Sequence, residues 1–126
     1  MIIRSLFFSL LALSLMGCGA TPKKYHEKYY QTQICNQLDG EMEYVLSDRT
    51  RVDCLSDEYA MEVDFAKKWA ESIGQALYYA YMTDKKPAVG LIVGKKDKRF
   101  LIRLQRVAKK FDIKIYVIDK EEWKNG

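Results

Sequence analysis

The sequence predicts an α/β domain with a mixed β-sheet, its elements in the order α-β-β-β-α-β-α-β. Residues 41–65 contain three short strand-like runs separated by turn residues, which is typical of an antiparallel meander. Residues 66–83 then change to a helical period. Residues 88–93 (AVGLIV) form a continuous apolar run, as in a central strand covered on both faces. A right-handed crossover should therefore lead from the meander to a fourth strand.

The meander follows a weakly helical segment, residues 25–38, which we expect to end at Asp39-Gly40. Its strands are expected at residues 41–46, 51–55 and 59–65. The turn Ser47-Asp48-Arg49-Thr50 separates the first two strands, so they should form a hairpin.

The helix of residues 66–83 has a well-defined apolar face in the sequence. Its members are Ala66, Trp69, Ala70, Ile73, Ala76, Leu77, Ala80 and Tyr81. A second stripe, away from the centre of that face, consists of Lys68, Ser72, Gln75 and Tyr79. A further helix is expected around residues 100–111 and a last strand at 113–118.

Residues 1–17 have the pattern of a bacterial lipoprotein signal peptide. Arg4 precedes an apolar run, Leu6 to Met16, that is short for a membrane span, and Gly17-Cys18 marks a cleavage point. The pattern resembles a lipobox, which implies a lipid on Cys18 and a tether over residues 18–24. The alternative is an uncleaved anchor helix. Both place the domain in the cell envelope, facing the periplasm, and Gly19 favours the outer membrane by the same resemblance.

Residues 25–126 are long enough for one domain and too short for two. The full chain has a formal net charge of +4. This mild excess is compatible with binding to nucleic acid or anionic lipid but does not argue for either.

Two cysteines remain once Cys18 carries lipid. In an oxidising compartment Cys35 and Cys54 are expected to form a disulfide, and two buried free thiols are the alternative. The only histidine is His26, so a zinc site is not expected.

Three acidic residues of the meander form the candidate site. Glu62 and Asp64 are two residues apart on the third strand and share one face. Asp53, on the second strand, can lie beside Glu62 if these strands pair. Converging carboxylates repel each other unless a cation lies between them, and oxygen ligands suit Mg²⁺ or Mn²⁺. The alternative is solvated charge on an edge strand.

These residues resemble the PD-(D/E)xK nuclease superfamily, whose restriction-endonuclease-like core includes the Holliday-junction resolvases. Asp53 matches the first acidic residue of the motif and Glu62 the second. Gln75 and Tyr79 resemble a Gln-x-x-x-Tyr motif on the following helix, and Glu43 resembles an extra Glu before the hairpin. The resemblance covers about residues 30–118.

The chain departs from this pattern at Asp64, where the superfamily has lysine. Some members take this lysine from the following helix, where Lys67 and Lys68 are the candidates. Lys68 is favoured because it lies on the same stripe as Gln75 and Tyr79.

The resemblance implies a lipid-anchored nuclease that uses Mg²⁺ or Mn²⁺ to hydrolyse DNA, with Asp53, Glu62 and Asp64 holding the metal. Two alternatives stay open: a catalytically inactive lipoprotein that binds nucleic acid or an envelope partner, and a structural lipoprotein without a ligand. Basic residues also cluster after the fourth strand and along the next helix, where they could face a phosphate backbone, anionic lipid or solvent. They are Lys95, Lys96, Lys98, Arg99, Arg103, Arg106, Lys109 and Lys110.

Overall fold

The computed structural model describes residues 25–120, so the predicted signal peptide, the lipidation site Cys18 and the tether lie outside the described residues. It confirms the α/β class, with a five-stranded mixed sheet and three α-helices in the described part of the chain. The elements are α1 (Glu27–Gln37), β1 (Glu41–Val45), β2 (Arg51–Leu55), β3 (Tyr59–Phe65), η1 (Ala66–Lys68), α2 (Trp69–Thr83), β4 (Lys86–Val93), α3 (Lys98–Phe111) and β5 (Lys114–Asp119). None of the helices within residues 25–120 is both long and apolar enough to cross a bilayer.

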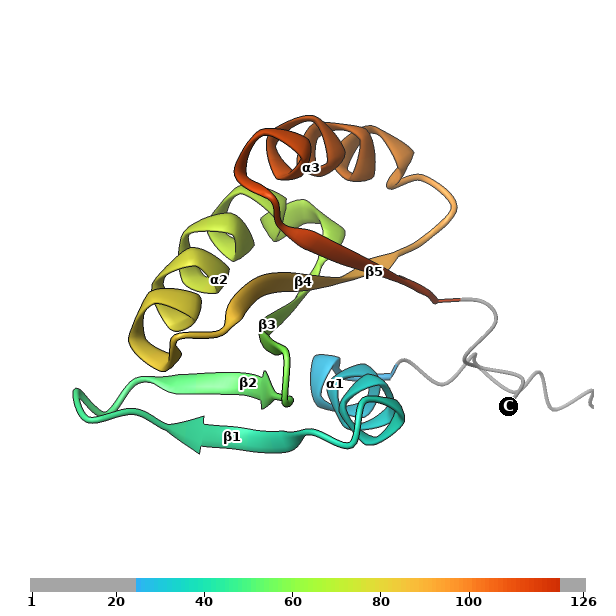
Figure 1. Ribbon diagram of the computed structural model, residues 1–126. Coiled ribbons are helices and arrows are strands. Elements are labelled where there is room, and N and C mark those ends of the chain that lie inside the picture. The colour runs from blue at the N-terminus through green and yellow to red at the C-terminus, as the bar shows by residue number, and fades with distance from the viewer. Residues whose placement is uncertain (1–24, 121–126) are drawn as a thin grey trace, which may run out of the picture.

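The strands lie side by side in the order β1-β2-β3-β4-β5. The first three are antiparallel neighbours, whereas β3, β4 and β5 run parallel. Figure 1 shows the β1–β2 hairpin turned away from the parallel part of the sheet, with α1 beside it and with α2 and α3 together on the other side. The parallel strands therefore have helices on both faces, as their apolar sequences require.

Two apolar clusters fill the spaces between the helices and the sheet. The cluster under α1 contains Tyr30, Met61, Val63 and Ile118. The cluster under α2 and α3 contains Ala76, Val89, Leu91, Leu104 and Ile113. Successive residues of β4 face opposite layers, since Ala88 and Ile92 belong to the first cluster and Val89 and Leu91 to the second.

The hairpin is distorted at its middle. Residues on either side pair in register, Met42 with Cys54 and Tyr44 with Val52. Glu43, between them, has a φ of 54°, which is uncommon for a residue other than glycine. Such backbone conformations persist only where surrounding contacts hold them. The register of the hairpin places Glu43 opposite Asp53, so the distortion lies at the candidate site.

A disulfide between Cys35 and Cys54 joins α1 to β2, with 5.6 Å between the Cα atoms. Both cysteines are fully buried. Gly40 packs against the bridge, where an added Cβ would collide with the Cys54 Sγ. The structure thus brings the two sulfurs together, and their oxidation in the native protein stays a prediction.

Oxidised protein should be more stable than reduced protein by about 3 kcal/mol, because the bridge closes a loop of about 20 residues in the unfolded chain. Denaturation with and without a reductant measures the difference. The variant with both Cys35→Ala and Cys54→Ala should not respond to the reductant. If the wild-type midpoint is equally unresponsive, the native protein does not contain the bridge.

Candidate functional site

The candidate site lies where β2 separates from β3. These strands pair through Cys54–Met61 and Leu55–Ala60. Beyond these pairs, the Val63 N–H donates to Asp53 Oδ2 at 2.7 Å, so a carboxylate replaces the next strand-to-strand bond. The separation of the strands thus places the Asp53 side chain beside β3.

Glu62 and Asp64 are buried beside Asp53, with 5% and 3% of their surface exposed. Their partners on β4 are Val89 and Leu91, which belong to the cluster under α2. The two acids therefore share the α2 side of the sheet. Both are buried and lie on the middle strand of the sheet, so solvated edge charge does not describe them.

Burial makes ionisation of these acids costly. It raises the pKa of Glu62 to about 10, with the nearby charges of Asp53 and Asp64 adding to the effect. Burial also raises the pKa of Asp53 to about 6, against the opposing hydrogen bond from Val63. At neutral pH Glu62 therefore holds a proton while its two neighbours are mostly ionised.

One oxygen of Glu62 has no partner among the described residues while all three acids are ionised; a proton shared with Asp53 or Asp64 would give it one. Oε2 is buried and forms no hydrogen bond within the described part of the chain. Ionised neighbours have no proton to donate, so an ionised Glu62 would leave this oxygen unsatisfied, at a cost of about 1–3 kcal/mol or more. A proton on Glu62 or a cation beside it would remove the conflict.

Lys68 reaches the site from the start of α2. Its Nζ lies 3.5 Å from Asp64 Oδ1, and the lysine side chain is half exposed. Burial and the charge of Glu27 raise the pKa of Asp64 to about 6, while Lys68 acts in the opposite direction. Lys67, the other candidate from the sequence, is exposed and does not share this ion pair.

Gln75 and Tyr79 lie on the α2 wall of the site. Gln75 Nε2 is 3.5 Å from Tyr79 Oη, at the limit of a hydrogen bond. The phenol pKa of Tyr79 is raised chiefly by burial, and the charges of Glu62 and Asp53 contribute. The Tyr79 phenol is therefore close enough to both acids to interact with them electrostatically.

The apolar face predicted for this helix is wrong in part. Tyr81 is 83% exposed, whereas Ser72 and Tyr79, assigned to the other stripe, are buried. Ser72 is tolerated inside because its hydroxyl donates to the Trp69 carbonyl at 2.8 Å. Tyr79 packs with Leu46 and Val52 beneath the hairpin. The hairpin adds a surface that extends the buried face of α2 toward Tyr79.

Gln31 of α1 is a site residue that the sequence analysis missed. Its buried Nε2 donates to Glu43 Oε1 at 3.0 Å and to the Asp53 carbonyl at 2.9 Å. Gln31 thus links β1 to β2 at the point where the hairpin is distorted. Its position one helical turn before Ile34 and Cys35, on the buried face of α1, was the available signal.

Glu43 is held at the border of the site and not within the buried group. It accepts the hydrogen bond from Gln31 and lies 4.0 Å from Arg51, with its side chain 34% exposed. Its charge also acts on Asp53.

No group of three or more His, Cys, Asp or Glu side chains among residues 25–120 has the arrangement of a metal site. The donor set nevertheless fits a hard cation, because three carboxyl groups influence one another and Glu62 Oε2 has no partner. Cation binding would require these side chains to move closer together and Glu62 to lose its proton.

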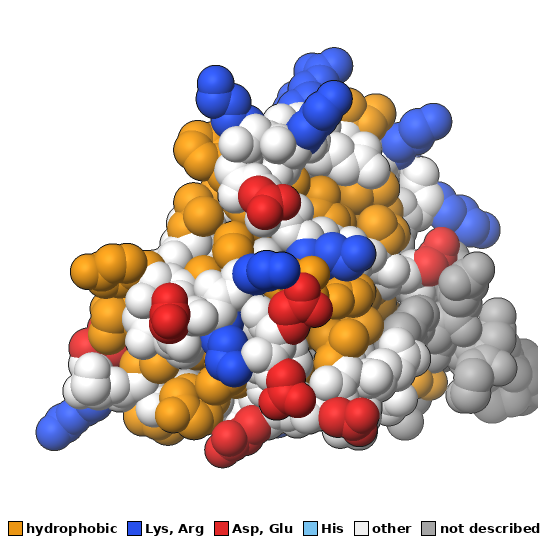
Figure 2. Space-filling model, in the orientation of Figure 1, with side chains coloured by type: hydrophobic (Ala, Val, Ile, Leu, Met, Phe, Trp, Pro, Cys, Tyr) orange, Lys and Arg blue, Asp and Glu red, His pale blue; other side chains and the backbone are white. Residues whose placement is uncertain are grey.

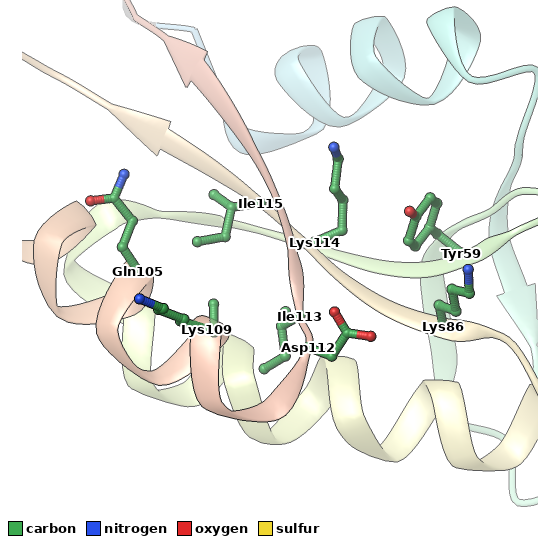
Figure 3. Close-up of a pocket in the computed structure, with 9 residues that line it drawn as sticks. Tyr59, Lys86, Gln105, Lys109, Asp112, Ile113, Lys114 and Ile115 are labelled. Atoms are coloured by element: carbon green, nitrogen blue, oxygen red, sulfur yellow. The ribbon is translucent and has the colours of Figure 1, made fainter.

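Two hollows flank the parallel strands at opposite ends. The first, of about 340 Å³, lies at the carboxyl ends and is lined by Phe65, Ala66, Lys67, Lys68, Asp97 and Lys120. The second, of about 500 Å³, lies at the starting ends beside the last turns of α3 (Figure 3). Its labelled lining includes Tyr59, Lys86, Lys109 and Lys114, and it contains none of the three acids.

Comparison with known proteins finds a similar viral protein, but it does not assign the chain to a family. The chain is 32% identical over 108 residues to a protein of Acanthamoeba polyphaga mimivirus that is described as containing a KilA-N domain. The match covers 84% of this chain but 42% of the relative, so the chain spans less than half of that protein's length. No family model matches, and no solved structure matches.

The buried carboxyl group of Glu62 should make the protein less stable as the pH rises. Its pKa is raised from 4.5 to about 10, so between these values the folded state keeps a proton that the unfolded chain has lost. Stability then falls with pH, by at most about 1.4 kcal/mol per pH unit for one proton. Asp53 and Asp64 contribute in the same direction only up to about pH 6.

Glu62→Gln should therefore flatten the stability profile above pH 6 and raise the melting temperature at pH 8. Thermal denaturation between pH 5 and 9, in a metal-free buffer, is the measurement. Glu71→Gln, at an exposed position of α2, is the matched control and should keep the wild-type slope. A Glu62→Gln profile parallel to wild type would show that Glu62 ionises freely.

Proposed function

We propose that this protein is a metal-dependent nuclease that hydrolyses phosphodiester bonds in DNA, anchored by a lipid on Cys18 and facing the periplasm. The observation that carries the proposal is the buried Glu62 with its unpartnered Oε2, held beside Asp53 and Asp64. A purely structural residue at this position would avoid the cost of such burial. Acidic groups with strongly shifted pKa values are more frequent at functional sites than elsewhere.

The arrangement of elements supports a restriction-endonuclease-like core. An antiparallel meander, β1-β2-β3, is followed by α2 and by β4 parallel to β3. Asp53 on β2 and Glu62 on β3 are the residues that resemble the two acidic positions of the motif, and they lie where these strands separate. The fold alone does not define an activity, so the proposal depends on the site.

Asp53, Glu62 and Asp64 are the residues that would hold Mg²⁺ or Mn²⁺. When bound, the metal would stabilise the negative charge that develops on the phosphodiester and lower the pKa of a bound water. Because Glu62 must lose its proton first, the affinity for metal should rise with pH.

Other side chains would position the substrate and the acids. Lys68 places a positive charge at the edge of the site, where it can attract a phosphate oxygen while paired with Asp64. The Tyr79 hydroxyl and the Gln75 amide provide uncharged donors on the α2 wall. Gln31 holds the Asp53 backbone and Glu43 in place.

A second candidate function is a nuclease-fold lipoprotein that binds nucleic acid or an envelope partner without cutting. Two observations favour it. Asp64 occupies the position where the motif has lysine, and the acids in residues 25–120 are not gathered as a preformed metal site. Both candidates share the fold but differ in whether metal binds to the acids.

DNA cleavage by the full chain, purified in neutral detergent with Mg²⁺ or Mn²⁺, tests the first candidate. Asp53→Asn and Glu62→Gln should each reduce the rate by about 100-fold or more, equivalent to about 2.7 kcal/mol of barrier. Glu71→Gln again serves as the control and should cut at the wild-type rate. Wild-type protein that is inert on DNA with either metal would remove the enzyme proposal.

Calorimetry distinguishes the two candidates. Mn²⁺ should bind wild-type protein more tightly at pH 8 than at pH 6 and should not bind Glu62→Gln, because that variant lacks the second carboxylate. Binding that is equal in Glu62→Gln and wild type would show that the metal is elsewhere. No binding to wild type at either pH would favour the non-catalytic role.

A further inference from the structure

The hollow at the carboxyl ends of β3, β4 and β5 has the chemistry of an anion site. Three lysines, Lys67, Lys68 and Lys120, line it together with one acidic residue, Asp97. The Asp97 carboxylate is already engaged, since Oδ2 accepts the Gly94 N–H at 2.9 Å. With three lysines against one aspartate, the lining carries a net positive charge.

Two of these lysines are available to a ligand. Lys67 forms no ion pair in the described part of the chain, and the Lys120 ammonium lies 4.9 Å from the centre of the Phe65 ring. Phe65 also packs edge-on against Tyr30, with the ring centres 6.2 Å apart. The ring fixes one wall of the hollow and keeps the Lys120 ammonium near its mouth.

The backbone adds to the positive potential. The hollow contains η1, which leads into α2, and Asp97, the residue before α3. Neither α2 nor α3 has a side-chain hydrogen bond capping its first turn. The first turns of both helices, with the positive ends of their dipoles, thus lie beside this hollow, although the Trp69 N–H already donates to the Ala66 carbonyl and the Phe100 N–H to the Asp97 carbonyl.

The hollow is joined to the acidic site through Lys68. This residue lines the hollow, and its Nζ lies 3.5 Å from Asp64 Oδ1. An anion in the hollow would therefore be held next to the group proposed to act on a phosphodiester. A nucleic-acid strand has such anions at every nucleotide, so two neighbouring phosphates could occupy the two places.

We propose that this hollow, with Lys67 and Lys120 as its principal ligands, binds a backbone phosphate of a DNA strand that flanks the phosphate at the acidic site. The proposal rests on the proposed function for its orientation, but binding itself needs no metal. The lysines that line the hollow supply charge without base contacts, so binding is independent of base sequence.

A membrane surface fits the hollow less well than a DNA strand. Basic surfaces that bind bilayers combine their charges with apolar side chains that enter the lipid. The large apolar side chains exposed within residues 25–120 do not line this hollow. They are Tyr44, Val45, Tyr78, Tyr81, Ile102, Phe111 and Val117. The basic side chains on α3 extend over its outer surface, at the top of the view in Figure 2.

The test measures binding of the full chain, in neutral detergent with EDTA, to a fluorescent DNA duplex of about 20 base pairs over a range of salt concentrations. Lys67→Gln and Lys120→Gln should each weaken binding about fivefold and reduce the magnitude of the salt slope by about one. Lys114→Gln, an exposed lysine at the opposite ends of the parallel strands, is the matched control and should change affinity less than twofold.

The outcomes separate this proposal from the nuclease proposal. If wild-type protein binds tightly and the Lys67 and Lys120 variants bind as well as Lys114→Gln does, the hollow is not the phosphate site and the nuclease proposal still stands. Wild-type protein that needs both lysines for binding but never cleaves DNA would support the hollow and overturn the nuclease. Absence of DNA binding, or lysine-dependent binding to phosphatidylglycerol vesicles only, would overturn the phosphate-strand assignment.

Discussion

The Glu62 carboxyl group, held away from water between Asp53 and Asp64, is the constraint around which this structure is arranged. Its burial raises its pKa to about 10, and its Oε2 has no hydrogen-bond partner within the described residues. Such a group costs folding free energy, and the surrounding core must offset that cost. Stabilising substitutions are often available at functional sites for this reason, because function there requires an arrangement that folding alone would not select.

The scaffold explains how the acids are kept in place. Glu62 and Asp64 pair with Val89 and Leu91 of β4, and this pairing fixes their backbone positions. Asp53 lies where β2 separates from β3, and it needs additional support. The Cys35–Cys54 bridge lies one residue from Asp53 on β2 and one helical turn from Gln31 on α1. The bridge thus holds α1 where Gln31 can donate to the Asp53 carbonyl and to Glu43, which ties the distorted hairpin to the site.

The sequence was most informative where a short period sets the geometry. The β2 and β3 strands lie at the predicted residues, and alternation correctly placed Glu62 and Asp64 on the face opposite Met61 and Val63. Alternation does not report strand separation, so the bond from Val63 to Asp53 and the depth of burial could not be predicted. The buried side of α2 was misassigned because it also packs against the hairpin through Tyr79. Gln31 was missed because one polar residue in a weakly helical segment reads as solvated until its partners are known.

The most direct measurement is the anomalous scattering of a crystal soaked in Mn²⁺ at pH 8, where the acids can ionise in exchange for metal. We expect a peak bounded by the side chains of Asp53 and Glu62, with Glu62 Oε2 among the ligands, and no such peak in a Glu62→Gln crystal. A fully soaked crystal whose Mn²⁺ lies elsewhere, with no metal beside Glu62, would contradict a cation site at these acids.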